Sequence, residues 1–238
     1  MHFLTNVLKS KHCIAIVISS LFVFSVGVQA QEKGPPKDKK EKTGYAIGAN
    51  IGQDMKRYSI EIDADMVTQG VKDAYTGKFT LSDDEIRTIL TDLNKEMQGK
   101  ENERMKIIGE KNKKEGEEFL SKNAKASGIK TLLGGLQYKV LKEGTGKTPK
   151  VNNTVVVHYK GTLLDGTEFD SSYKRNQPFE FVVGGNVISG WNEALLTMKV
   201  GSRWLVYIPS PLAYGERGNG PIGPNAVLVF DIELLSIK

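Results

Sequence analysis

Residues 155–191 read VVVHYKGTLLDGTEFDSSYKRNQPFEFVVGGNVISGW, and this stretch decides the fold of the C-terminal half of the chain. Its start alternates so that Val155, Val157 and Tyr159 share one face of a strand, because successive strand side chains point to opposite sides. An Asp-Gly turn follows between two apolar runs, as in a hairpin. Aromatic side chains then recur around one carboxylate set close among them, Asp170. This mixture predicts an apolar pocket with one polar group that orients a ligand.

The neighbouring segments predict several more strands and one short helix. Alternating patterns predict strands at residues 136–141, 203–209 and 226–237, together with the strand 179–183 inside the quoted stretch. Residues 189–196 predict a short helix that turns Trp191 and Leu195 inward. One short helix against many antiparallel strands is an α+β arrangement.

Four blocks of this half resemble the FKBP-type peptidyl-prolyl cis-trans isomerases. They are HYKGTLLDGTEFDSS (158–172), VISGW (187–191), LAYG (212–215) and NAVLVFDIELL (225–235), in the order of that family. The resemblance implies a curved antiparallel sheet of five or six strands wrapped on one short helix. It also implies an isomerase domain that begins near Lys130 and accelerates cis-trans exchange of X-Pro bonds in proline-containing polypeptides.

Carried over position by position, the resemblance implies a pocket with Trp191 as its floor and aromatic walls. The backbone N–H of Ile188 and the hydroxyl of Tyr214 would hold substrate carbonyls, and Asp170 would orient Tyr159 without shuttling a proton. The implied catalytic residues are Tyr159, Phe169, Asp170, Trp191, Tyr214 and Phe230, and the implied substrate-binding residues are Phe179, Val187, Ile188 and Ile222. The alternative is that these aromatic residues are ordinary core, and for Phe181 core is at least as good an interpretation.

The sequence departs from the family pattern at three places, which bear on substrate preference and macrolide affinity. Ser189 stands where many members have proline, Asn219 stands where some have histidine, and the loop 215–223 is shorter by about one residue. The resemblance implies no metal and no organic cofactor, and it implies binding of rapamycin-type macrolides. Twisting an amide needs no nucleophile, because an apolar pocket can disfavour the polar planar form.

The N-terminus predicts export. An apolar run from Ile14 to Val28 follows Lys9 and Lys11 and ends in the cleavage-type triplet Val28-Gln29-Ala30. A membrane anchor is the alternative, but the run is shorter than the roughly 20 residues of a spanning helix. We expect residues 1–30 to be a signal peptide, the mature chain to have no membrane span, and the destination to be the periplasm, with an outer-membrane or cell-surface location as the alternative.

Removal of this segment changes the chemistry available to the mature chain. Cys13 and two of the three histidines would be lost, and 33 − 2 = 31 basic residues would remain against 28 acidic ones, a net charge of +3. A cysteine nucleophile, a disulfide and a Cys/His zinc site are thereby excluded from the mature chain. The remaining His158 points away from Tyr159 on its strand, a poor position for a Ser-His-Asp triad.

The region before the isomerase domain predicts helices. We expect a disordered leader at 31–42, then a helix with Gly44, Gly48 and Gly52 on one face, suited to close packing against a partner helix or within its own domain. A second helix runs from Asp63 to about Tyr75 and ends at Gly77. Ser82 and Glu85 form a capping box that starts a third.

The third helix is predicted to be a long, solvent-exposed spacer that ends near Ser127-Gly128. Its alternating Lys and Glu support an exposed helix, while the balance of charge disfavours nucleic-acid binding and the lack of a heptad repeat disfavours a coiled coil. The segment Tyr45-Ala46-Ile47-Gly48 and the tail GPIGPN (220–225) resemble the macrophage infectivity potentiator (Mip) and FkpA branch of the family. That resemblance implies a homodimer joined through residues 43–97, with a helical domain at 43–128 and the isomerase domain at 129–238. A dimeric holdase chaperone, or a surface interaction protein in which isomerisation is secondary, is the alternative function.

Overall fold

The computed structural model describes residues 34–238, and the expected signal peptide with Cys13 lies outside the described residues. Three helices come first in the described chain: α1 (Lys39–Arg57), α2 (Ala64–Thr76) and α3 (Asp83–Asn123). The chain forms two compact units that divide after Asp54, within α1. None of the helices in residues 34–238 is both long and apolar enough to cross a membrane.

The first helix begins four residues before the expected Thr43, so the expectation of a disordered leader up to Lys42 is wrong for Lys39–Lys42. The helix begins early because Asp38 caps it, and this cap was not recognised in a segment rich in Lys and Pro. The Asp38 side chain accepts a hydrogen bond from the Glu41 N–H at 2.9 Å, and the Glu41 carboxylate accepts one from the Lys37 N–H at 2.7 Å. The first bond satisfies an N–H group that a helix start otherwise leaves without a partner, and the second ties the residue before the cap to the first turn.

The start and end signals of α2 and the start of α3 are confirmed. Asp63 caps α2 by accepting from the N–H groups of the two residues that follow Ala64, and Gly77 ends the helix with a left-handed φ of 66°. Ser82 and Glu85 form the reciprocal capping box at the start of α3. The long helix stops at Asn123, a few residues before the expected end, and Gly128 then turns the chain with a φ of 80°.

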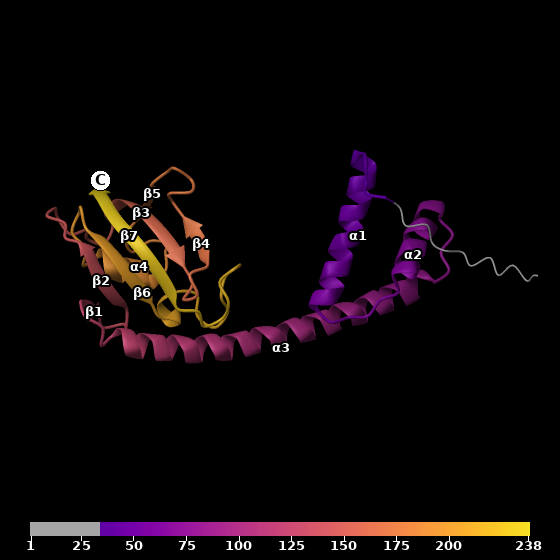
Figure 1. Cartoon of the computed structure of the whole chain (residues 1–238), viewed down its shortest axis with the longest axis horizontal. Helices are drawn as coiled ribbons and strands as arrows, with labels where there is room; N and C mark the ends of the chain where they lie inside the picture. The colour runs from indigo at the N-terminus through magenta and orange to yellow at the C-terminus, as the bar shows by residue number, and fades with distance from the viewer. Residues whose placement is uncertain (1–33) are drawn as a thin grey trace, which may run out of the picture. The chain divides into compact units, whose positions relative to one another are not determined.

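The long helix is exposed along most of its length, with ion pairs three and four residues apart, as expected. Its last third differs from a solvent-bridging spacer, because it packs on the sheet domain (Figure 1). The Phe119 and Tyr207 rings lie 5.5 Å apart between centroids. The Gln137 side chain donates to the Leu120 carbonyl at 2.8 Å and accepts from Asn123 at 2.9 Å.

The C-terminal region is a seven-stranded antiparallel sheet packed on the short helix α4 (Ser189–Leu195), as Figure 1 shows. The strand order is β1-β2-β6-β7-β3-β4, and β5 also pairs with β3. The strands are β1 (Ile129–Thr131), β2 (Gln137–Lys142), β3 (Thr154–Thr162), β4 (Glu168–Ser171), β5 (Phe179–Val182), β6 (Arg203–Ile208) and β7 (Leu228–Ile237), and a single 3-10 turn spans Ser210–Leu212. The sheet exceeds the expected five or six strands because the three-residue β1 adds an edge and because β4 and β5 form separate short strands.

Strand β3 pairs with three other strands, and this pairing places Tyr159. On one side it pairs with β7 along its length, and on the other β5 pairs with its first half and β4 with its last residues. Tyr159 lies between those two partners. Ser172 fills this gap, because its hydroxyl accepts from the Tyr159 N–H at 2.8 Å and its own N–H donates to the Tyr159 carbonyl at 3.0 Å.

The hydrophobic core lies between the sheet and α4. Val155 and Val157 are fully buried and Tyr159 is 5% exposed, as the alternating pattern predicts. From α4, Trp191 and Leu195 point into the same core, which strands β6 and β7 complete. The pocket described next is the outer end of this core, so its aromatic rings are held by the same packing that stabilises the domain.

Candidate functional site

A cavity of about 360 Å³ opens where β3, β4 and β7 meet the start of α4. All ten site residues expected from the resemblance border it: Tyr159, Phe169, Asp170, Phe179, Val187, Ile188, Trp191, Tyr214, Ile222 and Phe230. Asn186, Asn219 and Pro221 complete its lining. Phe181 is outside this lining and packs against the core, in line with the core interpretation.

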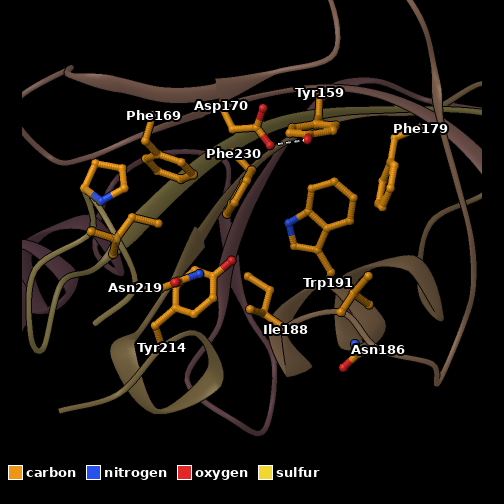
Figure 2. Close-up of a pocket in the computed structure, with 13 residues that line it drawn as sticks. Tyr159, Phe169, Asp170, Phe179, Asn186, Ile188, Trp191, Tyr214, Asn219 and Phe230 are labelled. Carbon is orange, nitrogen blue, oxygen red and sulfur yellow. Dashed lines mark hydrogen bonds between the residues drawn. The ribbon is translucent and has the colours of Figure 1, made fainter. Parts of the chain in front are cut away.

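Aromatic rings hold one another at the base of the cavity in edge-to-face contacts. The Trp191 ring lies 4.9 Å from that of Tyr159 and 5.2 Å from that of Phe230 between centroids, with ring planes at 83° and 87°. Phe169 meets Phe230 in the same manner at 5.5 Å. Such T-shaped contacts are the preferred geometry of aromatic pairs, so the rings form a rigid apolar base (Figure 2).

The indole N–H of Trp191 is buried and has no hydrogen-bond partner within the described residues. Figure 2 shows the nitrogen edge of the indole turned toward Phe230. A perpendicular ring face accepts weakly from an N–H, and the 87° angle between the two rings suits that contact. Because this N–H is buried, it adds no polar group to the surface of the cavity floor.

One polar cluster stands at the edge of this apolar cavity. The Tyr159 hydroxyl donates to an Asp170 carboxylate oxygen, and the Arg175 guanidinium donates both to the other oxygen and, at 2.7 Å, to the Tyr159 hydroxyl. The Ser171 N–H donates to Asp170 as well, at 2.8 Å. Each member thus holds the other two, and the Tyr159 hydroxyl cannot leave this position without breaking a charge-assisted bond.

The protonation states follow from these contacts. Burial alone would raise the pKa of Asp170, but the hydrogen bonds from Tyr159 and Arg175 and the guanidinium charge together hold it below its ordinary value. Burial, and then the bond to Asp170, raise the pKa of Tyr159 above its ordinary value. At neutral pH the cluster therefore contains an ionised carboxylate and a neutral phenol that donates to it.

Two groups opposite the cluster are free to hold a ligand. Figure 2 shows Tyr214 and Ile188 across the cavity from Asp170 and Tyr159. Ile188 is the residue before α4, and within the described chain its backbone N–H has no partner. Tyr214 is 37% exposed, and its ring borders the cavity. The cavity thus offers two hydrogen-bond donors on the side opposite the polar cluster, with apolar surface between them and the cluster.

The sequence interpretation missed Arg175 and, in the lining, Asn186 and Pro221, and it named Asn219 only as a departure from the family pattern. The available signal for Arg175 was its place five residues after the lone carboxylate, in the segment DSSYKR. That spacing alone gives no contact, because it depends on how the turn after Ser172 folds back. The bond from the Asn176 N–H to the Tyr173 carbonyl, at 3.0 Å, closes the turn that returns Arg175 to Asp170.

The comparisons with known proteins agree with this geometry. Residues 145–235 match the family described as FKBP-type peptidyl-prolyl cis-trans isomerase, and residues 40–140 match the domain amino terminal to FKBP-type peptidyl-prolyl isomerase. A fold of this kind around an aromatic pocket defines that class of enzyme, and the chain belongs to the FKBP-type peptidyl-prolyl cis-trans isomerase family.

Relatives in two organisms and one solved structure match most of the chain. Peptidyl-prolyl cis-trans isomerase Mip of Coxiella burnetii is 42% identical over 215 residues, which cover 90% of this chain and 93% of that protein. The outer membrane protein MIP of Legionella longbeachae is 42% identical over 201 residues, 84% of this chain and 86% of that one. The crystal structure of FkpA from Escherichia coli aligns with a TM-score of 0.65 at 41% identity and covers 86% of this chain and 99% of its own.

We expect the variant Arg175→Leu to raise the pKa of Asp170. The change removes a hydrogen bond and a positive charge that favour the carboxylate, while the burial that opposes ionisation remains. A group with a depressed folded pKa contributes stability above its unfolded pKa and loses it as pH falls through the folded one, so the acid-sensitive range should move to higher pH. The measurement is a ¹³C NMR titration of the Asp170 carboxyl group.

The matched control is Arg203→Leu, which breaks a two-bond pair with Asp231 on the sheet, outside the cavity lining. The control should leave the Asp170 titration unchanged. If Arg175→Leu and the wild-type chain gave the same Asp170 titration curve, the guanidinium would have no part in setting that carboxylate.

Proposed function

We propose that the C-terminal domain isomerises X-Pro bonds by seating the proline ring on Trp191 and twisting the preceding amide in the aromatic cavity. The planar amide is held by a resonance barrier of about 18–20 kcal/mol, and uncatalysed exchange takes tens to hundreds of seconds. The twisted amide is less polar than the planar one. An apolar cavity that excludes water therefore favours the transition state over the ground state.

Each wall has a role in this mechanism. Tyr159, Phe169 and Phe230 exclude water from the amide, and the carboxylate of Asp170 fixes the Tyr159 hydroxyl and polarises the bound amide. The Ile188 N–H and the Tyr214 hydroxyl hold substrate carbonyls on either side of the proline. The side chains of Phe179, Val187 and Ile222 border the ring. The observation that carries this proposal is the hydrogen-bonded cluster of Tyr159, Asp170 and Arg175 at the edge of a cavity with an aromatic base.

The mechanism needs neither a nucleophile nor proton transfer. His158, the histidine of residues 34–238, directs its Nδ1 to the Ser172 hydroxyl at 2.9 Å and stacks on Tyr173 at 4.6 Å, away from the cavity lining. The Asp170 carboxylate is already satisfied by three donors. It serves as a fixed charge that orients its neighbours.

The same cavity would accept a rapamycin-type macrolide. Its volume of about 360 Å³ lies at the small end of ligand pockets, and its lining combines apolar rings with a few fixed donors, as such pockets do. A macrolide would compete with proline-containing polypeptides for the Trp191 floor.

The wider organisation is an exported protein with two functional regions. Residues 1–30 direct export to the periplasm or outer surface, residues 43–128 form a helical domain, and residues 129–238 form the isomerase domain. The name of the Legionella relative, an outer membrane protein, supports an envelope location. The clients would then be unfolded or partly folded proteins of that compartment.

The helical region joins two chains into a homodimer through residues 43–97. Among residues 34–238, a Cβ added at Gly44, Gly48 or Gly52 would meet nothing within 4 Å, which leaves that face of α1 open to a second helix. Large apolar side chains on α2 and α3 are also exposed, with Met66 at 63% and Ile89 at 54%. Exposed apolar surface of this kind marks interaction sites.

A holdase activity is the second candidate function, and the same exposed apolar residues favour it. If two chains present two isomerase domains to one unfolded client, binding at the second becomes intramolecular and gains effective concentration. Holding a client in this manner would not depend on catalysis in the cavity.

The variant Asp170→Leu separates the two functions. Loss of the carboxylate removes the acceptor of the Tyr159 hydroxyl and leaves Arg175 without its anionic partner. The kcat/KM for an X-Pro peptide should therefore fall by about ten- to a hundredfold, since small misplacements of a site group cost that much. Proline-limited refolding of a client should slow with it, while suppression of client aggregation should persist. Asp231→Leu, which unpairs Arg203 on the sheet, is the control and should retain activity.

Full isomerase activity in Asp170→Leu would show that the cluster of Tyr159, Asp170 and Arg175 is not needed for isomerisation. Equal loss of isomerisation and of aggregation suppression would instead show that one surface performs both functions.

The variant Gly48→Glu tests the dimer. A charged side chain on the small-residue face of α1 should convert the chain lacking residues 1–30 from dimer to monomer, because it blocks close helix approach and buries an unpaired carboxylate. Gln53→Glu, on the opposite face of the same helix, should remain dimeric. Sedimentation velocity at micromolar concentration measures the oligomeric state of both variants and of the wild-type chain. A monomeric wild-type chain, or a dimeric Gly48→Glu, contradicts the proposed interface.

A further inference from the structure

The C-terminal part of α3 carries two buried glycines in a helix whose other residues are exposed or half-buried. Gly109 and Gly116 are the buried residues of this 41-residue helix. They are seven residues apart, which is two turns, so they lie on the same face. Glycine is a poor helix former. Its presence at these two positions therefore points to a contact that a larger residue would prevent.

That contact is with residues 223–227 of the isomerase domain. A Cβ on Gly116 would lie 2.7 Å from Val227 Cγ2, and a Cβ on Gly109 would lie 3.1 Å from Pro224 Cβ. By contrast, a Cβ on Gly99 of the same helix would meet nothing within 4 Å. The helix backbone is thus pressed against the segment at two points.

Reciprocal side-chain bonds lock the same two segments together. The Asn112 amide donates to the Pro224 carbonyl at 2.8 Å, and the Asn225 amide donates to the Gly109 carbonyl at 3.3 Å. Asn225 has a left-handed φ of 55°, a conformation that asparagine tolerates better than most residues. Helix and loop are therefore joined by direction-specific bonds as well as by packing.

The opposite end of this loop forms a wall of the cavity. Asn219, Pro221 and Ile222 line the cavity, and Asn219 and Ile222 exchange two backbone bonds at 2.8 and 3.0 Å. The Asn225 N–H donates to the Gly215 carbonyl at 2.9 Å, next to Tyr214. Only Gly223 separates Ile222 from Pro224. A shift of Pro224 at the α3 contact should therefore also shift Ile222 in the cavity wall.

We propose that residues 109–116 of α3 are a positioning element of the isomerase site, which set the cavity wall of Asn219, Pro221 and Ile222 by holding Pro224 to Val227. Gly109, Asn112 and Gly116 act through the loop and touch no substrate. The long helix is thus part of the catalytic unit as well as an arm. This inference rests on the proposed isomerisation in the cavity.

A graded glycine series in the chain lacking residues 1–30 tests the proposal. Gly116→Ala should lower kcat/KM for an X-Pro peptide by about three- to tenfold, mainly through a higher KM, because displacement of a binding wall by a fraction of an ångström weakens substrate binding. Gly109→Ala, with the wider clearance, should lose less. Gly99→Ala should match wild type, which controls for the greater helix propensity of alanine.

A compensating variant separates positioning from general damage. Val227→Ala removes the methyl group that the new Cβ would strike, so Gly116→Ala/Val227→Ala should recover most of the lost kcat/KM. If Gly116→Ala acted only by destabilising the fold, the double variant should have a lower kcat/KM than Gly116→Ala, since it also loses a buried contact. Amide hydrogen exchange should show faster exchange at residues 219–225 in Gly116→Ala and unchanged exchange in β3 and β7.

The outcomes separate this proposal from the isomerase assignment itself. If wild type accelerates the peptide and Gly116→Ala equals Gly99→Ala, the positioning role is wrong and the isomerase assignment stands. The role is equally wrong if the double variant is less active than Gly116→Ala. No acceleration by the wild-type chain would instead contradict the isomerase function on which both depend.

Discussion

The packing of α4 against the sheet is the interaction on which the rest of the domain depends. Trp191 enters the core from α4, where its indole is 4% exposed and meets Tyr159 and Phe230 edge to face. The floor of the cavity is thus the outer surface of the hydrophobic core. A close-packed interior resists small displacements, so the cavity inherits the rigidity of the fold. The proposed mechanism, which uses shape and desolvation, depends on this rigidity rather than on reactive groups.

Hydrogen bonds from side chains hold Tyr159 at a gap in the strand pairing. Tyr159 lies on β3 where neither β4 nor β5 pairs with it, and the Ser172 hydroxyl and backbone supply the missing bonds. The ring hydroxyl is then held by Asp170 and Arg175. The gap between β4 and β5 therefore leaves room beside Tyr159, a candidate site residue. Hydrogen bonds from Ser172, Asp170 and Arg175 then hold Tyr159 in place.

Much of the fold and of the candidate site could be predicted, since alternation and capping are local signals. The alternation of Val155 to Tyr159 placed the buried face, and the Ser82 box placed the start of α3. The contacts of Arg175 could not be predicted, because they depend on a turn whose path no periodicity encodes. The contact of Gly116 with Val227 is also beyond local patterns, because it joins residues far apart in sequence. The early start of α1 at Lys39 was missed because an Asp38 cap was hidden in a charged, proline-rich segment.

The measurement that tests the central claim most directly is cis-to-trans isomerisation of a short X-Pro peptide by residues 31–238, with and without a rapamycin-type macrolide. The account predicts exchange well above the uncatalysed rate of tens to hundreds of seconds, and its loss when the macrolide fills the cavity above Trp191. A folded chain that leaves the rate unchanged, or whose acceleration survives a bound macrolide, would contradict catalysis in this cavity.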